Sequence, residues 1–395
     1  MGFGALALVV AAGLVGPLLA SLGRFGPPVV VGQIAAGLVI GTSGFGWVHP
    51  NDPLLSGLSE VGFALLMFVV GTHLPVRDAR LRSALPAGAA IAATVAVLAA
   101  AGGLAMAPLV GFHRPAVIAV LLATSSGAVA LPVIQGLSEQ SRPLLVLTVW
   151  IALADVGTVL ALPIVLATGS LGRVLIGGVL VVASGVLLFL VVRFAAPHPV
   201  VRRVRTWSSE RGWGLDLRVS LLALFVAAWV AVHFGTSILI AGFTMGTVVA
   251  LLGEPRRVAL ELIGLGEGFV IPLFFVHLGA QLDLGALVRS PSAIRLAIGL
   301  AVTAVAIHVV AAVVWRLPVG TGLLASVQLG VPAAVVSIGL ASGALTQAQG
   351  AAVMASVLGT LVACAVGGVL LGNSRPLTTA APLGGQDGGG VTPTR

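Results

Sequence analysis

The residues with the clearest potential for chemistry are two ionisable side chains inside long apolar segments. Asp155 stands in the middle of one segment, and His308 lies deep in another. An acid at the centre of a bilayer costs about 2.5–3.5 kcal/mol on insertion scales, so such a residue usually lines an ion path. For Asp155 the alternative is a structural acid paired with a neighbouring helix. For His308 a structural histidine bonded to a backbone carbonyl and a functional partner of Asp155 are equally open.

Two further segments, 115–136 and 319–345, are interrupted by small or helix-breaking residues. The first interruption comprises Thr124, Ser125, Ser126, Gly127 and then Pro132, and the second comprises Gly330 and Pro332. Unwound backbone in a membrane offers free carbonyl oxygens, and the adjoining half-helices add their dipoles. Interruptions at matching places of two halves indicate the central site of a transporter, whereas kinks satisfied by neighbouring helices are the alternative.

The helix face around Asp155 also carries hydroxyl groups. Thr148 and Thr158 precede and follow the aspartate by seven and three residues, which places all three side chains on one face of a helix. We therefore expect that face to be the polar one.

One short motif indicates a different chemistry. Gly41-Thr42-Ser43-Gly44 matches the G-x-S-G of intramembrane serine proteases, whose serine needs a histidine base on another helix. Ser43 falls near the end of its apolar segment, and a chain with 53 glycines contains such strings by chance. The sequence contains no H-E-x-x-H or paired-aspartate motif, so we expect no metal and no cofactor.

The composition determines the kind of element that must position these residues. Of the 395 residues, 58% are hydrophobic and 8% are charged, and the mean hydropathy is +1.15. Soluble domains carry about a quarter charged residues. The composition therefore excludes a soluble enzyme, a disordered protein and a nucleic-acid binder. Cys364 is the only cysteine, so no intrachain disulfide can form.

A membrane-spanning helix needs about 20 predominantly apolar residues. Breaks at proline, glycine and arginine clusters predict an all-α polytopic membrane protein with about 13 spans in two inverted halves. The spans lie roughly at 3–22, 28–46, 54–74, 84–108, 115–136, 143–168, 173–195, 216–234, 236–253, 267–284, 292–315, 319–345 and 349–372. The whole of 1–372 is then one transmembrane domain in contact with the lipid bilayer, and the polar, glycine-rich residues 373–395 form a disordered tail.

The arginines predict the orientation. All twenty basic residues are arginine, and thirteen spans place sixteen of them on one side and four on the other. Because arginine collects on the cytoplasmic side, we expect the N-terminus outside the cell membrane and the C-terminus in the cytoplasm.

A polar linker, 196–215, joins the two halves. It holds a cluster of three arginines, Arg202, Arg203 and Arg205, beside two tryptophans, Trp207 and Trp213. An ordinary positive-inside linker with interfacial tryptophans is the favoured interpretation, and a lipid-binding segment is the alternative.

Several motifs together resemble those of the cation:proton antiporters of the Kef/NapA-like group. The resemblance covers roughly residues 5–370 and depends on the order and spacing of Pro27–Gln33, Leu58–Gly62, Phe68–Gly71, Thr124–Val129, Ala241–Phe243, Ile271–Val276 and Leu282–Leu284. It implies an elevator-type homodimer with a dimer domain and a core domain, in which two partly unwound helices cross. Asp155 falls where the family has its ion-binding aspartate, and His308 where many members have a lysine.

The expected function is therefore exchange of a monovalent cation, Na⁺ or K⁺, for protons. Proton and cation compete for Asp155, and groups around Thr124, Ser125 and Ser126 help to hold the cation. One acid in the core predicts one cation per proton with no net charge moved, and His308 is a candidate proton or charge partner. A potassium efflux system, a serine-based intramembrane enzyme and a non-transporting sensor are the alternatives.

Overall fold

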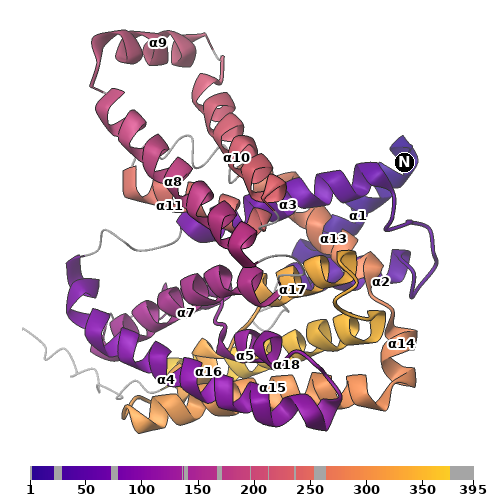
Figure 1. The fold of residues 1–395 in the computed structure, drawn as a ribbon. Helices are drawn as coiled ribbons and strands as arrows, with labels where there is room; N and C mark the ends of the chain where they lie inside the picture. The colour runs from indigo at the N-terminus through magenta and orange to yellow at the C-terminus, as the bar shows by residue number, and fades with distance from the viewer. Residues whose placement is uncertain are drawn as a thin grey trace, which may run out of the picture.

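The structure is a computed structural model, and it describes residues 2–21, 29–72, 79–135, 137, 141–166, 171–195, 197–211, 213–234, 237–252 and 264–373. Its helices follow one another from the N-terminus as Figure 1 shows. They are α1 (Phe3–Ala20), α2 (Val29–Ile40), α3 (Pro53–Thr72), α4 (Ala79–Val110), α5 (Pro115–Ala123), α6 (Gly127–Gln135), α7 (Arg142–Leu166), α8 (Leu171–Ala195), α9 (Pro199–Glu210), α10 (Leu215–His233), α11 (Ile238–Leu252), η1 (Gly266–Val270), α13 (Ile271–Gln281), α14 (Leu284–Arg289), α15 (Pro291–Val314), α16 (Val319–Ala325), α17 (Gly330–Ala341) and α18 (Gln347–Asn373).

The predicted fold class is confirmed. Within the part of the chain that the structure describes, eight helical segments are long and apolar enough to cross a membrane, one of them being α16 and α17 taken together, and shorter apolar helices accompany them. Each of the thirteen predicted spans coincides with one helix or with two helices in succession. The three paired cases are α5 with α6, η1 with α13, and α16 with α17, where a span is broken or changes its helical winding.

Two helices lie outside the predicted spans. Helix α9 occupies most of the linker 196–215, which the sequence presented only as a polar connection. It lies across the ends of α8 and α10 in Figure 1. Helix α14 is a short element after α13, and the carboxylate of Asp283 caps it by accepting a hydrogen bond from the amide of Ala286 at 2.8 Å. Residues 374–395, which include nearly all of the predicted tail, lie outside the described ranges.

The helices pack as two groups. Helices α4 to α7 and α14 to α18 contact mainly one another, and we call them the α7 group. Helices α1 to α3, α8, α10, α11, η1 and α13 also contact mainly one another, and we call them the α3 group. Helix α7 contacts both α8 and α11, so the two groups meet along α7.

Glycine permits the closest packing in the α3 group. A Cβ atom added at Gly37 of α2 would overlap the backbone carbonyl of Val276 on α13, and one at Gly279 of α13 would overlap that of Ile34 on α2. The two backbones therefore touch. Helices in lipid associate through such small-residue contacts, because apolar side chains gain little by leaving the equally apolar lipid.

Candidate functional site

Asp155 lies in the middle of α7 and is 8% exposed. Among the acidic side chains that the structure describes, it is the buried one. Its Oδ2 atom accepts a hydrogen bond from the backbone amide of Gly127 at 3.2 Å, and Gly127 is the first residue of α6. The positive end of a helix dipole stabilises a negative charge, so the start of α6 partly offsets the cost of burying this carboxylate.

The three residues before α6 are not helical. Thr124 ends α5 with extended backbone (φ −74°, ψ 144°), and Thr124, Ser125 and Ser126 are all buried. The break therefore brings three hydroxyl groups and several backbone groups into the interior, beside the helix that carries Asp155. This is the polar lining that a membrane interior tolerates only where protein surrounds it.

A second break lies against the first. Residues 326–329 separate α16 from α17, and 327–329 of them have no helical structure. The amide of Ser126 donates a hydrogen bond to the carbonyl of Val327 at 2.8 Å. The side-chain amide of Gln328 donates to the carbonyl of Leu121 on α5 at 2.6 Å. The two broken helices thus cross at their unwound segments, and each break satisfies backbone groups of the other.

The hydroxyl of Thr124 is oriented by α7. Thr158, three residues after Asp155, donates to the carbonyl of Ala154 at 2.7 Å, and its oxygen lies 3.0 Å from that of Thr124. Because Thr158 has one proton and directs it to Ala154, Thr124 is the donor between the two hydroxyls. The oxygen of Thr124 consequently keeps its lone pairs for another partner. Thr148, expected on the same face, bonds instead to Leu144 of its own helix at 2.9 Å.

The hydroxyl of Ser125 is oriented in the same way by α15. Nδ1 of His308 lies 2.8 Å from the carbonyl of Ala304, which can only accept, so Nδ1 carries a proton. In the neutral imidazole Nε2 is then an acceptor. The hydroxyl of Ser125, 3.3 Å away, donates to Nε2. His308 is fully buried. Its ring nitrogens bond to Ser125 and Ala304, and no hydrogen bond joins the described side chains of His308 and Asp155.

Trp150 completes the surroundings of His308. Its ring stacks on the imidazole with centroids 5.7 Å apart and planes 14° from parallel. Trp150 is fully buried, and its indole Nε1 is the one buried side-chain nitrogen or oxygen without a hydrogen-bond partner in the described part of the chain. The stack fixes the plane of the imidazole, and with it the direction of the bond to Ser125.

The helix-breaking residues named from the sequence lie just after the breaks. Gly127 and Gly330 are the first residues of α6 and α17, and Pro332 stands in the first turn of α17. Proline fits there because the first amides of a helix have no partner within it. Pro132 lies within α6. The unwound backbone itself is 124–126 and 327–329.

Ser43 bonds to residues that are not part of this site. Its hydroxyl donates to the carbonyl of Leu282 and accepts from the amide of Leu284 at 2.9 Å, so it ties the end of α2 to the end of α13. A serine that makes both of these bonds has a structural role. No group of three or more histidine, cysteine, aspartate or glutamate side chains suited to a metal ion is found in the described ranges.

Sequence reasoning missed two contributors to the site, Gln328 and Trp150. Gln328 is 2% exposed and its amide crosses to α5, yet in the sequence it is one polar residue beside a Gly-Val-Pro string. The position of Gln328 deep in an apolar span could have indicated a role in the site, because a buried side-chain amide needs hydrogen-bond partners. Trp150 gave no such signal, since tryptophan is common in apolar segments.

Comparison with known proteins gives the chain its relatives. The profile of the family described as "Sodium/hydrogen exchanger, transmembrane" matches residues 9–373. The Na⁺/H⁺ antiporter of Enterococcus hirae is 26% identical over 291 residues, which are 71% of this chain and 73% of that protein. The glutathione-regulated potassium-efflux system protein KefC of Enterobacter sp. (strain 638) is 27% identical over 277 residues, 68% of this chain and 43% of KefC. The chain spans about half the length, or less, of several curated relatives that it matches.

A solved structure has a similar fold. The sodium proton antiporter MjNhaP1 from Methanocaldococcus jannaschii matches with a TM-score of 0.64 over 94% of this chain and 97% of that chain. The two sequences are 15% identical in this match, so it shows a shared fold and not shared site residues.

Proposed function

The chain belongs to the sodium/hydrogen exchanger family of monovalent cation/proton antiporters, and we propose that it exchanges one monovalent cation, Na⁺ or K⁺, for one proton at Asp155. The observation that carries this proposal is the burial of the Asp155 carboxylate at the start of α6, where two broken helices cross. The family is one of membrane transporters, not of enzymes, which agrees with the structural role of Ser43.

The proton and the cation compete for the same carboxylate. At low pH a proton occupies Asp155. At higher pH the ionised carboxylate holds the cation, together with the oxygens of Thr124 and Ser125, because both hydroxyls direct their protons away to Thr158 and His308. Ser126 adds a third buried hydroxyl. Oxygen donors of this kind are the usual ligands of hard cations.

Alternating access follows from the charge of the loaded and empty forms. A bare carboxylate moves through the low-dielectric centre of a membrane at a large cost, whereas the protonated and the cation-loaded forms are close to neutral. Only a loaded carrier can therefore change sides easily. We assign the movement to the α7 group, which carries Asp155 and both breaks, relative to the α3 group, which would form the dimer contact.

His308 acts in this scheme as the partner of Ser125. Its ring donates to Ala304 and accepts from Ser125, and the Trp150 stack keeps it in that plane. A neutral histidine in this position carries no charge across the membrane. The exchange then moves one cation against one proton.

From the distribution of the arginines, we expect the N-terminus to face the outside.

Two relatives are named after different cations. The Enterococcus hirae protein is named a Na⁺/H⁺ antiporter, whereas KefC is named a potassium-efflux system protein. The oxygens around Asp155 suit either ion, because both are hard monovalent cations. Potassium efflux is therefore the second candidate for this chain.

The purified protein in liposomes, supplied with Na⁺, K⁺ or Li⁺ in turn, tests the proposal. Each cation that is a substrate should release protons from acid-loaded vesicles, and Asp155→Asn should abolish this movement for all three. Glu60→Gln changes an exposed acid in the same way and should leave the exchange unchanged. Normal exchange by Asp155→Asn would remove Asp155 from the site, and no cation-dependent proton movement by the unchanged protein would favour a sensor.

A further inference from the structure

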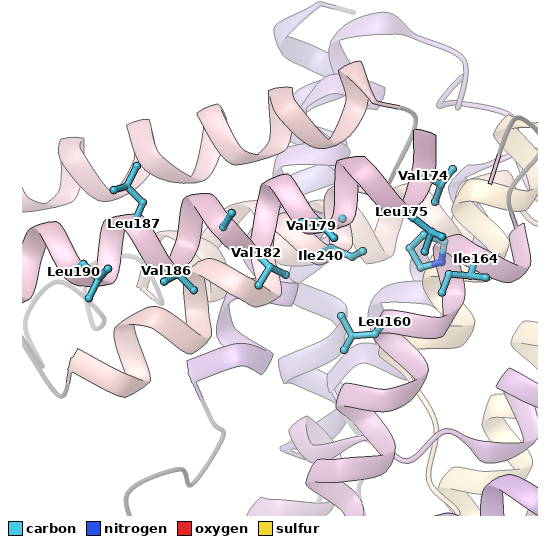
Figure 2. Close-up of a pocket in the computed structure, with 13 residues that line it drawn as sticks. Leu160, Ile164, Val174, Leu175, Val179, Val182, Val186, Leu187, Leu190 and Ile240 are labelled. Atoms are coloured by element: carbon cyan, nitrogen blue, oxygen red, sulfur yellow. The ribbon is translucent and has the colours of Figure 1, made fainter. Parts of the chain in front are cut away.

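An apolar groove of about 680 Å³ lies between the two helix groups. Leu160 and Ile164 of α7 line one wall, residues of α8 line most of the other, and Ile240 of α11 lies between them (Figure 2). Each of its thirteen lining residues is aliphatic, proline or glycine. Nothing in this lining could bind the cation or the proton of the proposed exchange.

The groove follows one face of α8. Leu175, Val179, Val182, Val186 and Leu190 recur at intervals of three and four residues, which places them in one stripe along the helix. Figure 2 shows these side chains in a row along α8. From Val174 to Leu190 the helix rises by about 24 Å, most of the roughly 30 Å thickness of a bilayer's hydrocarbon layer.

The stripe ends at a cation. Arg193 follows Leu190 by three residues, lies in the last turn of α8 and is exposed. It therefore stands on the same face as the groove, at its end. The side with Arg193 is the one that the arginine distribution predicts to be cytoplasmic, where anionic lipids concentrate.

Helix α9 adds further charge at the same end. It begins four residues after α8 ends and exposes Arg202 and Arg203. At its C-terminus the guanidinium of Arg211 lies 5.7 Å from the ring centroid of Trp207 and 5.2 Å from that of Trp213. Basic residues with tryptophan are typical of segments at the headgroup level of a membrane.

We infer that this groove is a binding site for one anionic phospholipid, with an acyl chain along α8 and the phosphate at Arg193. The occupant is lipid because the groove is wholly apolar, lies within spanning helices and ends at an exposed arginine. Side chains that face it, such as Val179 and Leu187, are 68% and 63% exposed in the chain alone. Since the groove lies between α7 and α8, a bound lipid touches both helix groups.

The test measures lipid binding and not transport. The full-length protein, purified in detergent, is mixed with equal amounts of phosphatidylglycerol and phosphatidylcholine, and native mass spectrometry counts the bound lipids. We expect one retained phosphatidylglycerol. Val182→Trp should fill the groove and remove it, while Val226→Trp, at an exposed position of α10 outside the groove, should leave it bound.

The charge is tested separately. Arg193→Gln should lower the preference for phosphatidylglycerol over phosphatidylcholine by about five-fold, the effect of one cation near an anionic headgroup. Arg218→Gln, an exposed arginine at the start of α10, is the matched control. Asp155→Asn should retain the lipid, which separates this site from the proposed transport site.

Three outcomes would overturn the inference. Equal loss of lipid in Val182→Trp and Val226→Trp would mean that the retained lipid is general annular lipid. An unchanged headgroup preference in Arg193→Gln would remove the phosphate from that arginine. A change of oligomeric state in Val182→Trp, with no lipid bound to the unchanged protein, would assign the groove to a second copy of the chain.

Discussion

The hydroxyl of Ser125 lies 3.3 Å from Nε2 of His308, although 183 positions separate the two residues in the chain. This bond joins the unwound segment between α5 and α6 to the C-terminal half of α15. Because Nδ1 of the same ring donates to Ala304, the histidine orients the serine hydroxyl and leaves the serine oxygen free to accept. His308 thus has a defined structural partner, Ser125, two residues before the Gly127 amide that bonds Asp155.

Replacement of His308 distinguishes a positioning residue from a proton carrier. His308→Gln keeps a polar group near Ser125, so we expect the pH profile of exchange to stay in place. His308→Leu leaves the Ser125 hydroxyl without its acceptor, which should cost about 1–3 kcal/mol of stability. Proton flux against pH in everted vesicles and thermal unfolding of the purified variants are the measurements. A pH profile displaced in His308→Gln would make the histidine a proton carrier.

Thr124 and Thr158 provide a matched pair for the cation site. Thr124→Val removes an oxygen whose lone pairs are free, so we expect the apparent KM for the cation to rise about ten-fold, the loss of one interaction with a charged group. Thr158→Val removes the partner hydroxyl on α7 and should lower stability by about 1 kcal/mol. Its KM should rise less than that of Thr124→Val, because Thr124 keeps its oxygen and loses only the acceptor of its proton. Initial rates over a cation series provide both constants. Equal KM values for the two variants would exclude Thr124 as a ligand.

The amide of Gly127 can be removed without replacing Asp155. Proline is tolerated at the first position of a helix, so Gly127→Pro should keep α6. It removes the N–H that bonds Asp155 Oδ2, and its Cδ atom, in the place of that hydrogen, pushes the carboxylate away from the start of α6. A hydrogen bond to a charged group contributes about 1.5–3 kcal/mol, so cation affinity should fall by ten-fold or more.

Gly127→Ala is the control for this change. A Cβ there would meet Asp155 Oδ2 at 3.4 Å, an ordinary contact, and the amide remains. The cation dependence of proton flux in proteoliposomes compares the two variants. The same affinity in both would mean that the Gly127 amide does not stabilise the ionised site.

The count of charges predicts the response to voltage. Asp155 is the one buried acid among the described residues. With His308 neutral, as proposed, each cycle moves one cation against one proton. A charge that crosses 100 mV exchanges about 2.3 kcal/mol with the field, and an electroneutral cycle exchanges none. Proteoliposomes with a valinomycin-set potential and no pH gradient should therefore show no sustained cation uptake. Sustained uptake would require a second charge in the cycle.

Much of the fold could be predicted because hydropathy is a local property. Each apolar run of about 20 residues must become a helix in a membrane, whatever lies beside it, since its backbone has no other partner there. That is why all the predicted spans coincide with helices. The linker helix α9 was not predicted, because its arginines and tryptophans fit a helix and an irregular connection equally well.

For the site, the order of residues along the chain already identifies the side chains that are costly to bury, since Asp155, His308 and the hydroxyls of 124–126 stand in apolar runs whatever their neighbours. Their partners depend on how the helices pack. Ser126 meets Val327, Ser125 meets His308, and Gln328 reaches Leu121, over separations that no local pattern encodes. A burial cost belongs to one residue, whereas a hydrogen bond depends on the packing of two distant helices.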